Sequence, residues 1–419
     1  MRILFVHQNF PGQYKHIAAA LARESRNQVV ALAHHEQPAP DGVRVVRYGL
    51  TRQPSTAHAL ARDFERKVVY GEAAARAAIQ LRSDGFAPDV ICGHPGWGET
   101  LFLKDVWPNA RLLSFQEFYY RVDSDFNFEP DDPVTDPSAL WKLRARNVAF
   151  LSAIESSDWN VTPTRWQWSQ LPGFARAHTS IIHDGIDTDA ASPNTQATIT
   201  LGRAGVCRPG DEIVSFISRN LERYRGYHIF MRALPEILKR RPNARAVIVG
   251  GDGVSYGAAP RGERSWKDIF LAEVRDQLDM SRVHFVGRVP HATYLNLLQV
   301  SAAHVYLTYP FVLSWSMLEA MASECLVIGS RTAPVTEAIE HGANGLLADF
   351  FAPGAIADAV IDVLAEPQKY RPLREAARRT VLERYDLVSI CLPRHLALIG
   401  EVAEGRTPAS PEPDAEKLD

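Results

Sequence analysis

Short apolar runs rich in Val, Ile and Leu recur along the whole chain, and stretches of mixed polar and apolar residues separate them. Most of these runs are apolar at every position, so they lack the alternation of a strand with one face in water. Strands that are apolar on both faces belong in parallel sheets covered by helices on both sides. We therefore predict β-strands at residues 2–6, 28–33, 43–48, 89–92, 111–115, 159–162, 180–183, 213–217, 244–249, 282–286, 304–307, 326–329 and 345–348.

The stretches between these strands carry apolar residues at the spacing of a helix. The clearest helices are expected at residues 16–23, 70–82, 229–240 and 314–321. A chain that alternates strands and helices in this way folds as a doubly wound α/β protein. The strands form two series, and the stretch 190–200 between them, which contains Pro, Asn and Thr, is typical of a linker.

Two segments are expected to lie outside this regular pattern. Residues 123–137 are acidic and rich in proline, which indicates a long loop at a functional edge. Residues 404–419 are rich in Pro, Ala, Glu and Asp, and we expect them to be disordered. The apolar run 2–6 is too short for a signal peptide, and no run approaches the roughly 18 apolar residues of a membrane span. We therefore expect a cytoplasmic protein.

The composition narrows the class of function. Lys and Arg number 46 and Asp and Glu 49, so the net charge of −3 gives no electrostatic support for nucleic-acid binding. The four cysteines are scattered and form no Cys-x-x-Cys pair, which disfavours a disulfide framework or a structural zinc site. A reduced cytoplasmic compartment is the simplest interpretation. The basic residues 239–241, at the end of a predicted helix, leave peripheral contact with the inner face of a membrane open.

Several local patterns resemble functional motifs but have simpler explanations. A glycine-containing turn at residues 7–13 could receive an anion before the next helix, and a plain turn explains it equally well. Residues 253–257 spell Gly-x-Ser-x-Gly, but no good helix start follows the serine, as a hydrolase elbow requires. Two Asp-x-Asp pairs, at 123–125 and 187–189, could bind a metal ion but are common in acidic loops.

A stronger signal follows the predicted strand 213–217. Arg219 and Arg225 lie six residues apart on a loop between this strand and the next helix. Open α/β sheets bind ligands at this edge, and guanidinium groups suit a diphosphate. Solvated surface arginines are the alternative interpretation.

A second helix start carries related chemistry. Leu313, Ser314 and Trp315 open a helix whose first backbone N–H groups favour a phosphate. Glu319, on the same helix, is placed to accept hydrogen bonds from a ribose diol. An exposed surface glutamate is the alternative, although most of its neighbours on this helix are apolar.

At these residues the chain resembles the retaining GT-B glycosyltransferases of family 4, and the resemblance covers nearly the whole chain. Each motif alone is weak, but their order is specific. The opening Val-His-Gln-Asn-Phe-Pro-Gly-Gln and the hexapeptide 163–168 are similar to one bacterial subgroup. The other motifs that carry the resemblance are Gly12 in the first loop, residues 181–187, the loop 219–226, residues 249–253, residues 283–287, the helix 318–322 and residues 344–347.

The resemblance implies the GT-B fold, with two Rossmann-like doubly wound domains facing a central cleft. We expect an N-terminal, acceptor-side domain at residues 1–195 and a C-terminal domain for the nucleotide sugar at residues 196–386. A helix at residues 387–403 is expected to cross back to the first domain, ahead of the tail 404–419.

The resemblance also assigns roles on the donor side. Arg219 matches the phosphate-binding arginine of the family, and Arg225 stands where a lysine is usual. Glu319 matches the second glutamate of the Glu-x7-Glu motif, which binds ribose. The first glutamate of that motif is replaced by Phe311, and Ser314 replaces the family glycine, so the usual carboxylate contact to the donor sugar is missing.

Further site residues follow from the same resemblance. Gly12 and Gly253 are expected to line the donor site, and His94 matches the histidine that faces the donor sugar. The alternative for His94 is a loop histidine that caps the backbone. The aromatic and acidic segment with Glu117, Tyr119 and Tyr120 is a candidate wall for a carbohydrate acceptor, and an ordinary edge loop explains it equally well.

The implied activity is a metal-independent, retaining hexosyl transfer from a UDP- or GDP-sugar to a glycan, lipid-linked or small-molecule acceptor. No metal and no cofactor are expected beyond the nucleotide diphosphate sugar. Arg219 and Arg225 would stabilise charge on the departing diphosphate, and His94 would orient the sugar. The setting implied is bacterial surface polysaccharide synthesis.

Three other functions remain open at this stage. A sugar-nucleotide epimerase of the same fold would act without an acceptor. A nucleotide-sugar-binding protein that has lost catalysis would fit Phe311 and Ser314, and a serine esterase would need Ser255 as its nucleophile. The sequence does not reveal the oligomeric state.

Overall fold

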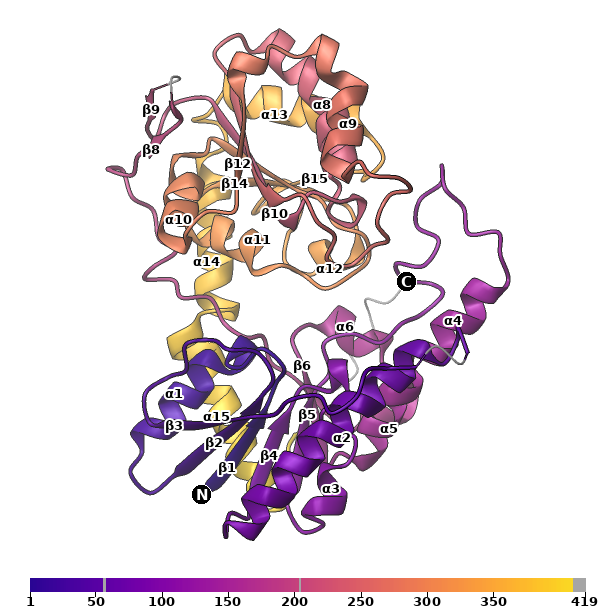
Figure 1. Cartoon of the computed structure of the whole chain (residues 1–419). Helices are drawn as coiled ribbons and strands as arrows, with labels where there is room; N and C mark the ends of the chain where they lie inside the picture. Colours follow the sequence, from indigo (N-terminus) through magenta and orange to yellow (C-terminus); the bar gives the residue numbers. More distant parts are fainter. Residues whose placement is uncertain (56–57, 203–204, 410–419) are drawn as a thin grey trace. The chain divides into compact units, whose positions relative to one another are not determined.

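The computed structural model describes residues 1–55, 58–202 and 205–409. The chain divides into two compact units. One consists of Met1–Asp184 together with Cys391–Asp419, and the other of Gly185–Ile390. Each unit is an α/β layer structure in which helices cover both faces of a parallel sheet (Figure 1). The predicted fold class of two Rossmann-like sheets is confirmed.

Within the described residues, the first unit contains a seven-stranded sheet in the order β3-β2-β1-β4-β5-β6-β7. Every pairing in this sheet is parallel. The strands lie within two residues of their predicted bounds. They are β1 (Arg2–Val6), β2 (Gln28–Ala33), β3 (Val43–Arg47), β4 (Val90–Gly93), β5 (Arg111–Phe115), β6 (Trp159–Thr162) and β7 (Thr179–Ile181).

Both faces of this sheet are buried, which explains why its central strands are apolar throughout. On one face Ile3 and Phe5 of β1 pack with residues of α1 and α15, and on the other Leu4 and Val6 pack with residues of α2 and α3. The helices of this unit are α1 (Lys15–Arg23), α2 (Arg62–Ser83), α3 (Leu103–Val106), α4 (Ser138–Arg146), α5 (Val148–Ser156), α6 (Arg165–Gln170), α7 (Gly173–Arg176) and α15 (Leu392–Ala403).

The described part of the second unit contains a six-stranded sheet in the order β12-β11-β10-β13-β14-β15, also parallel throughout. A small antiparallel hairpin, β8 (Ile199–Thr200) with β9 (Val206–Cys207), precedes it and was not predicted. The sheet strands are β10 (Ile213–Asn220), β11 (Arg245–Gly251), β12 (Val283–Gly287), β13 (Ala303–Tyr306), β14 (Leu326–Ser330) and β15 (Leu346–Ala348).

Helices cover both faces of the second sheet as well. The stacking of Phe216 of β10 on Phe230 of α8, with ring centroids 4.9 Å apart, marks one face. Helices α10, α11 and α14 pack on the other face. The helices are α8 (Tyr227–Arg240), α9 (Trp266–Val274), α10 (His291–Val300), α11 (Trp315–Ala322), α12 (Ala333–Thr336), α13 (Pro353–Ala365) and α14 (Arg371–Arg384).

The chain joins the second unit at Gly185, before the linker expected from composition. The reason is a backbone bridge between Ile186 and the segment after α14. Ile186 donates to the Tyr385 carbonyl at 2.8 Å, and Leu387 donates to the Ile186 carbonyl at 2.9 Å. The chain returns to the first unit at Cys391, where Leu398 and Ile399 of α15 enter the core of that unit.

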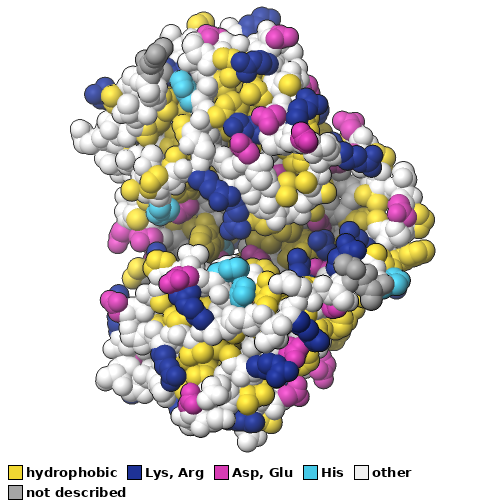
Figure 2. Space-filling model, viewed as in Figure 1, with side chains coloured by type: hydrophobic (Ala, Val, Ile, Leu, Met, Phe, Trp, Pro, Cys, Tyr) yellow, Lys and Arg dark blue, Asp and Glu magenta, His cyan; other side chains and the backbone are white. Residues whose placement is uncertain are grey.

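Two features of the surface bear on the sequence predictions. Residues 404–409 follow α15 without helix or strand after the turn at Gly405, and the rest of the predicted tail, 410–419, lies outside the described residues. Of the three basic residues at the end of α8, Arg240 is paired with Asp358 at 2.7 Å and Arg241 is paired with Glu212. On the face shown in Figure 2, acidic and basic side chains are interspersed.

No helix in the described ranges is both long enough and apolar enough to cross a membrane.

Candidate functional site

The loop after β10 presents one arginine to solvent. Arg219 is exposed, and its guanidinium makes no hydrogen bond or ion pair with another described residue. It lies at the carboxyl end of a central parallel strand, the edge at which open α/β sheets bind their ligands. A guanidinium in this position is available to an anion.

The next residues fasten this loop to the segment after β11. The Asn220 amide donates to Ser255 Oγ at 2.7 Å, and the buried Glu222 carboxylate accepts the backbone N–H groups of Ser255, Tyr256 and Gly257. A carboxylate that takes several N–H groups fixes the path of the loop that it faces. Glu222 therefore shapes the segment that contains Gly253, a role that the sequence did not suggest.

The glycines after β11 differ in what they require. A Cβ on Gly251 would lie 2.6 Å from Asn220 Oδ1, and one on Gly250 would lie 2.7 Å from the Leu221 side chain. A Cβ on Gly253 would meet its nearest neighbour at an ordinary 3.5 Å. Packing therefore demands Gly250 and Gly251, whereas Gly253, the predicted donor-binding glycine, is free of crowding. No helix begins in this stretch before α9, so the hydrolase motif lacks its structural context.

Arg225, the second predicted arginine, is buried. Its Nη1 donates to Tyr306 Oη at 3.2 Å, to Thr308 Oγ1 at 2.8 Å and to the Val312 carbonyl at 3.0 Å. These bonds tie the loop after β10 to the loop after β13. Arg225 thus stabilises the loops around the site, whereas the Arg219 side chain is exposed to solvent.

Aromatic rings fill the space around Arg225. Phe311 lies 4.8 Å from the ring of Tyr256 and 5.4 Å from that of Tyr224, and the Arg225 guanidinium lies 5.1 Å from the Tyr256 ring centroid. Phe311 is buried in this cluster. The position where the family has a carboxylate is therefore part of an apolar wall.

The start of α11 carries a side-chain cap. Ser314 is the N-cap, its hydroxyl accepts from Ser316 N–H, and its own N–H donates to Tyr306 Oη at 2.8 Å. Leu313 is buried in the core, and Trp315 is exposed. Of these three predicted residues, Leu313 can contribute only its backbone to a ligand, because its side chain is occupied in packing.

Glu319 faces two partners on α10. His291 Nε2 lies 3.1 Å from one carboxylate oxygen, and the Tyr294 hydroxyl donates to the other at 2.6 Å. Burial, together with the Glu319 charge, raises the pKa of Tyr294 well above its ordinary value, so its hydroxyl stays protonated and keeps donating. The carboxylate is thus held in one orientation.

In the first unit, His94 and Glu117 form a pair. His94 Nδ1 accepts the Gly96 N–H at 3.1 Å, so Nε2 carries the proton of the neutral ring, and Nε2 lies 3.3 Å from Glu117 Oε2. The imidazole stacks on Trp97 with centroids 4.6 Å apart. His94 therefore does cap the backbone, as its alternative reading predicted, while its other nitrogen faces a carboxylate.

Gly12 owes its place to His7. Gly12 has a φ of +46°, and a Cβ there would lie 2.5 Å from His7 Cε1. The His7 ring lies edge-on to His94, with centroids 5.3 Å apart. Burial, reinforced by His94, lowers the pKa of His7 to about 3, so this ring is neutral. Sequence analysis did not single out His7 as a site residue. Its position directly after the first strand is the signal that could have identified it.

The predicted acceptor residues are partly committed to the interior. Tyr119 packs against the cluster of α5 and α7, and the Tyr120 ring lies 4.7 Å from the Arg146 guanidinium. Glu117 is positioned through its carbonyl, which accepts from the Gln167 amide. Gln167 belongs to the hexapeptide 163–168, so that motif has a structural purpose that its sequence alone did not disclose.

The described residues contain no group of three or more His, Cys, Asp or Glu side chains that could hold a metal ion.

Comparison with known proteins bears on the family and the fold. The family described as "Glycosyl transferase family 4 group" matches residues 25–191, and the one described as "Glycosyl transferases group 1" matches residues 203–380. The chain is a family-4-like glycosyltransferase with the GT-B fold. This glycosyltransferase is 25% identical over 306 residues to a D-inositol 3-phosphate glycosyltransferase of Corynebacterium urealyticum, covering 71% of its own length and 68% of the relative.

Other relatives align over shorter parts. For the enzyme of the same name from Corynebacterium glutamicum the identity is 23%, over 66% of this glycosyltransferase and 63% of the relative, which is less than two thirds. Spore coat protein SA of Bacillus subtilis is 26% identical over 50% of this chain and 55% of its own.

Solved structures support the fold of this glycosyltransferase. Sucrose-phosphate synthase from Thermosynechococcus elongatus superimposes with a TM-score of 0.73 at 18% identity, over 96% of this chain and all of that one. Anabaena HepE, solved in complex with UDP and glucose, gives a TM-score of 0.68 at 17% identity, over 96% and 100%.

Proposed function

We propose that this protein transfers a hexosyl group from a nucleotide diphosphate sugar to a hydroxyl acceptor with retention of configuration. The observation that carries the proposal is Arg219, an exposed guanidinium without a partner among the described residues, at the carboxyl edge of the second sheet. Around it, hydrogen bonds join three loops into one rigid support: those after β10, β11 and β13. The similarity to Anabaena HepE, whose structure was solved with UDP-glucose, supports a uridine nucleotide sugar as the donor, with a GDP-sugar as the other choice.

The roles of individual residues follow from charge and position. Arg219 neutralises the diphosphate as it leaves, with the backbone N–H groups that open α11 adding to the field. Glu319, oriented by Tyr294, accepts the ribose hydroxyls. Arg225 joins the loops after β10 and β13 through its hydrogen bonds to Thr308 and to the Val312 carbonyl. Gly253 lets the backbone approach the donor without crowding.

In the first unit, we assign His94 to the transferred sugar. Its Nε2–H, directed by Glu117, donates to a sugar hydroxyl or shares charge that develops at the anomeric carbon. Gly12 keeps the adjoining loop in contact with His7. No protein nucleophile is required, because an oxygen of the donor diphosphate can take the proton of the acceptor hydroxyl on the same face. This front-face route needs no metal ion.

The acceptor belongs with the first unit in this proposal. Glu117, Tyr119 and Tyr120 lie on the segment after β5, and the exposed part of this segment supplies carboxylate and aromatic surface for a carbohydrate. A glycan, a lipid-linked saccharide or a small polyhydroxylated molecule would satisfy this surface. Synthesis of bacterial surface polysaccharide, at the inner face of the membrane, is the setting that we propose.

The first experiment is a thermal-shift screen of the full chain with UDP, GDP, ADP, CDP and dTDP, each repeated as its sugar conjugate. A ligand at about 100 times its Kd stabilises the protein by roughly 2.7 kcal/mol, which gives a clear rise in Tm. A rise with one base, lost in Arg219→Ala, is the expected result. The absence of a rise with every nucleotide would refute the proposed donor site.

One observation favours a second candidate. Phe311 fills the place of a sugar-binding carboxylate with an apolar ring, which suits a protein that binds a nucleotide sugar without transferring it. The two candidates differ in turnover. Release of the nucleoside diphosphate from its sugar in the presence of acceptors supports transfer, whereas a thermal shift without any release supports binding alone.

A further inference from the structure

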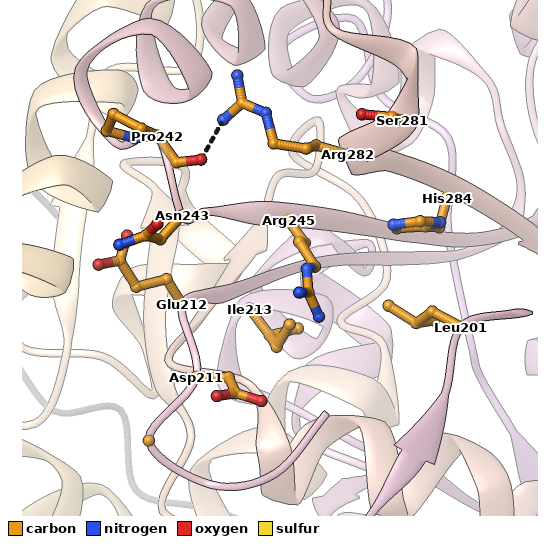
Figure 3. Close-up of a pocket in the computed structure, with 11 residues that line it drawn as sticks. Leu201, Asp211, Glu212, Ile213, Pro242, Asn243, Arg245, Ser281, Arg282 and His284 are labelled. Carbon is orange, nitrogen blue, oxygen red and sulfur yellow. Dashed lines mark hydrogen bonds between the residues drawn. The ribbon is translucent and has the colours of Figure 1, made fainter. Parts of the chain in front are cut away.

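A cavity lies at the edge of the second unit's sheet opposite to the candidate site. It has a volume of about 890 Å³ and is lined by residues at the amino ends of β10, β11 and β12 and by Leu201, which follows β8 (Figure 3). Strand β11 has seven residues at about 3.3 Å each, so this cavity lies about 20 Å from the donor loops. It is therefore separate from the site described above.

Two charged residues of the lining are already neutralised. Arg282 Nη1 donates to backbone carbonyls, including that of Pro242 at 3.1 Å, and its Nε pairs with Asp279 at 2.9 Å. Glu212 is paired with Arg241 through both carboxylate oxygens. These side chains form the frame of the cavity and are not available to a ligand.

Arg245 differs from these residues, because its guanidinium has no oxygen partner among the described side chains. Its side-chain partner among the described residues is Cys207 Sγ at 3.2 Å, and sulfur is a weak acceptor. The side chain is half-buried, and Figure 3 shows it pointing away from β11 into the space between Asp211 and Leu201. A partly desolvated guanidinium with such a partner strongly favours an oxyanion.

A second donor stands beside it. His284 of β12 is in register with Val247 of β11, two residues beyond Arg245, so both side chains lie on the same face of the sheet. His284 Nε2 is buried without a hydrogen-bond partner among the described residues. Burial, together with the charge of Arg245, lowers the pKa of His284, so the ring is neutral and has one N–H to donate.

The remaining polar groups suit hydroxyls. Asp211 has its carboxylate at the cavity, held by the Arg208 N–H at 2.9 Å, and the Asn243 amide makes no hydrogen bond with another described residue. Carboxylate and amide groups beside an apolar residue, here Leu201, are the usual surroundings of a polyhydroxylated ring. A bare phosphate would leave most of the cavity empty.

We propose that this cavity binds an anionic saccharide, whose oxyanion pairs with Arg245 and His284 and whose hydroxyls bond to Asp211 and Asn243. The oxyanion is the phosphate of a sugar phosphate or the carboxylate of a uronic acid. The site is a binding site for an effector or a product, and it is independent of the donor site.

The test is isothermal titration calorimetry of the full chain with glucose 6-phosphate, glucuronate, glucose and inorganic phosphate. We expect one of the two anionic sugars to bind more tightly than both glucose and phosphate, which also identifies the oxyanion. Arg245→Met and His284→Phe should each weaken this binding by roughly tenfold or more, because each removes a hydrogen bond to a charged group. Arg379→Met is the matched control, since Arg379 is exposed on α14 and makes no hydrogen bond or ion pair with another described residue.

Each result decides the proposal. Unchanged affinity in both cavity variants, binding no tighter than that of phosphate, or no binding of either anionic sugar would overturn it. The thermal shift with a nucleoside diphosphate serves as the folding control. A variant that keeps that shift but loses the anionic sugar supports the second site, and failure of the shift in the parent protein concerns the donor site alone.

Discussion

At the scale of single residues, the loop after β10 contains one arginine that holds loops together and one that is exposed without a described partner. The Nη1 of Arg225 donates to Tyr306 Oη, Thr308 Oγ1 and the Val312 carbonyl, whereas Arg219 has no hydrogen-bond or ion-pair partner among the described residues. Substitution of Arg225 and of Arg219 should therefore affect different properties of the protein. We expect the stability of the fold to depend on Arg225 and the turnover of the proposed reaction to depend most on Arg219.

Arg219→Ala should lower kcat/KM for the donor by about 10² to 10³, because it removes a charge placed where the diphosphate develops its own. Its free energy of unfolding should change by less than about 0.5 kcal/mol, since an exposed side chain without partners is lost. Steady-state kinetics and urea unfolding measure the two quantities. Near-normal turnover would exclude the assigned role.

Arg225→Ala should cost about 3 kcal/mol of stability, because Tyr306, Thr308 and the Val312 carbonyl lose a shared buried partner. The same urea titration checks this, with Arg379→Ala as the exposed control. A loss no larger than that of the control would show that the hydrogen bonds of Arg225 contribute little.

Besides His7, two further buried histidines should make the first unit sensitive to acid. Burial lowers the pKa of His183 to about 3, and burial lowers that of His395 to about 4. In the unfolded chain each titrates near 6.5. Below that pH the unfolded chain binds protons that the folded chain does not, so the free energy of unfolding falls as the pH drops.

Each of these histidines should remove about 2 kcal/mol of stability between pH 7 and pH 5. Urea unfolding at both values measures the loss, and His395→Gln should lose about 2 kcal/mol less than the parent chain over this range. The exposed His35→Gln in the same unit is the control. Equal losses in parent and His395→Gln chains would contradict the prediction.

At the scale of elements, the turn between β10 and α8 depends on one glycine. Gly226 has a φ of +68°, and a Cβ there would lie 2.3 Å from Leu307 Cβ. Gly226→Ala should therefore cost about 2 to 4 kcal/mol and displace Arg225. Gly342→Ala, at φ +77° with open space around it, carries only the backbone strain of about 1 kcal/mol and is the matched control. Thermal unfolding compares the two, and equal losses would rule out the clash.

The strands were the most predictable elements, for a physical reason. A strand buried on both faces is mostly apolar, so β1 and β2 could be located from their composition. The hairpin β8–β9 was missed, because two-residue strands leave no periodic signal. Helix α2 begins eight residues before its predicted start at Tyr70, because its first turns are largely polar.

The candidate site was predictable only in part. Arg219 and Glu319 follow from their place after strands and on a helix start. Three other features depend on contacts between segments that are apart in sequence. They are the burial of Arg225, the hold of Glu222 on the loop of Gly253, and the packing of His7 against Gly12. A local pattern carries no information about such contacts.

At the scale of the whole molecule, the chain leaves the first unit and returns to complete its core. Leu398 of α15 is buried among residues of β1, β4 and α1. Leu398→Ala should therefore cost about 2 to 4 kcal/mol in the first unit and little in the second. Hydrogen exchange should show faster exchange in β1 and β4, with β10 and β11 unchanged. Val388→Ala, at a side chain 65% exposed, is the control, and equal exchange in both variants would contradict the prediction.

The sequence by itself determined the class of fold and the strands of both sheets, because a buried strand shows itself as a short apolar run. It also indicated the sheet edge at which α/β proteins bind ligands, because parallel strands place their carboxyl ends at one edge. The tertiary structure decided which charges are free. Of two arginines six residues apart, one is enclosed by Tyr306 and Thr308 and the other is open. It also created the cavity at Arg245, whose walls come from segments more than 70 residues apart. Partnership of polar groups is a property of packing, and only the folded chain fixes it.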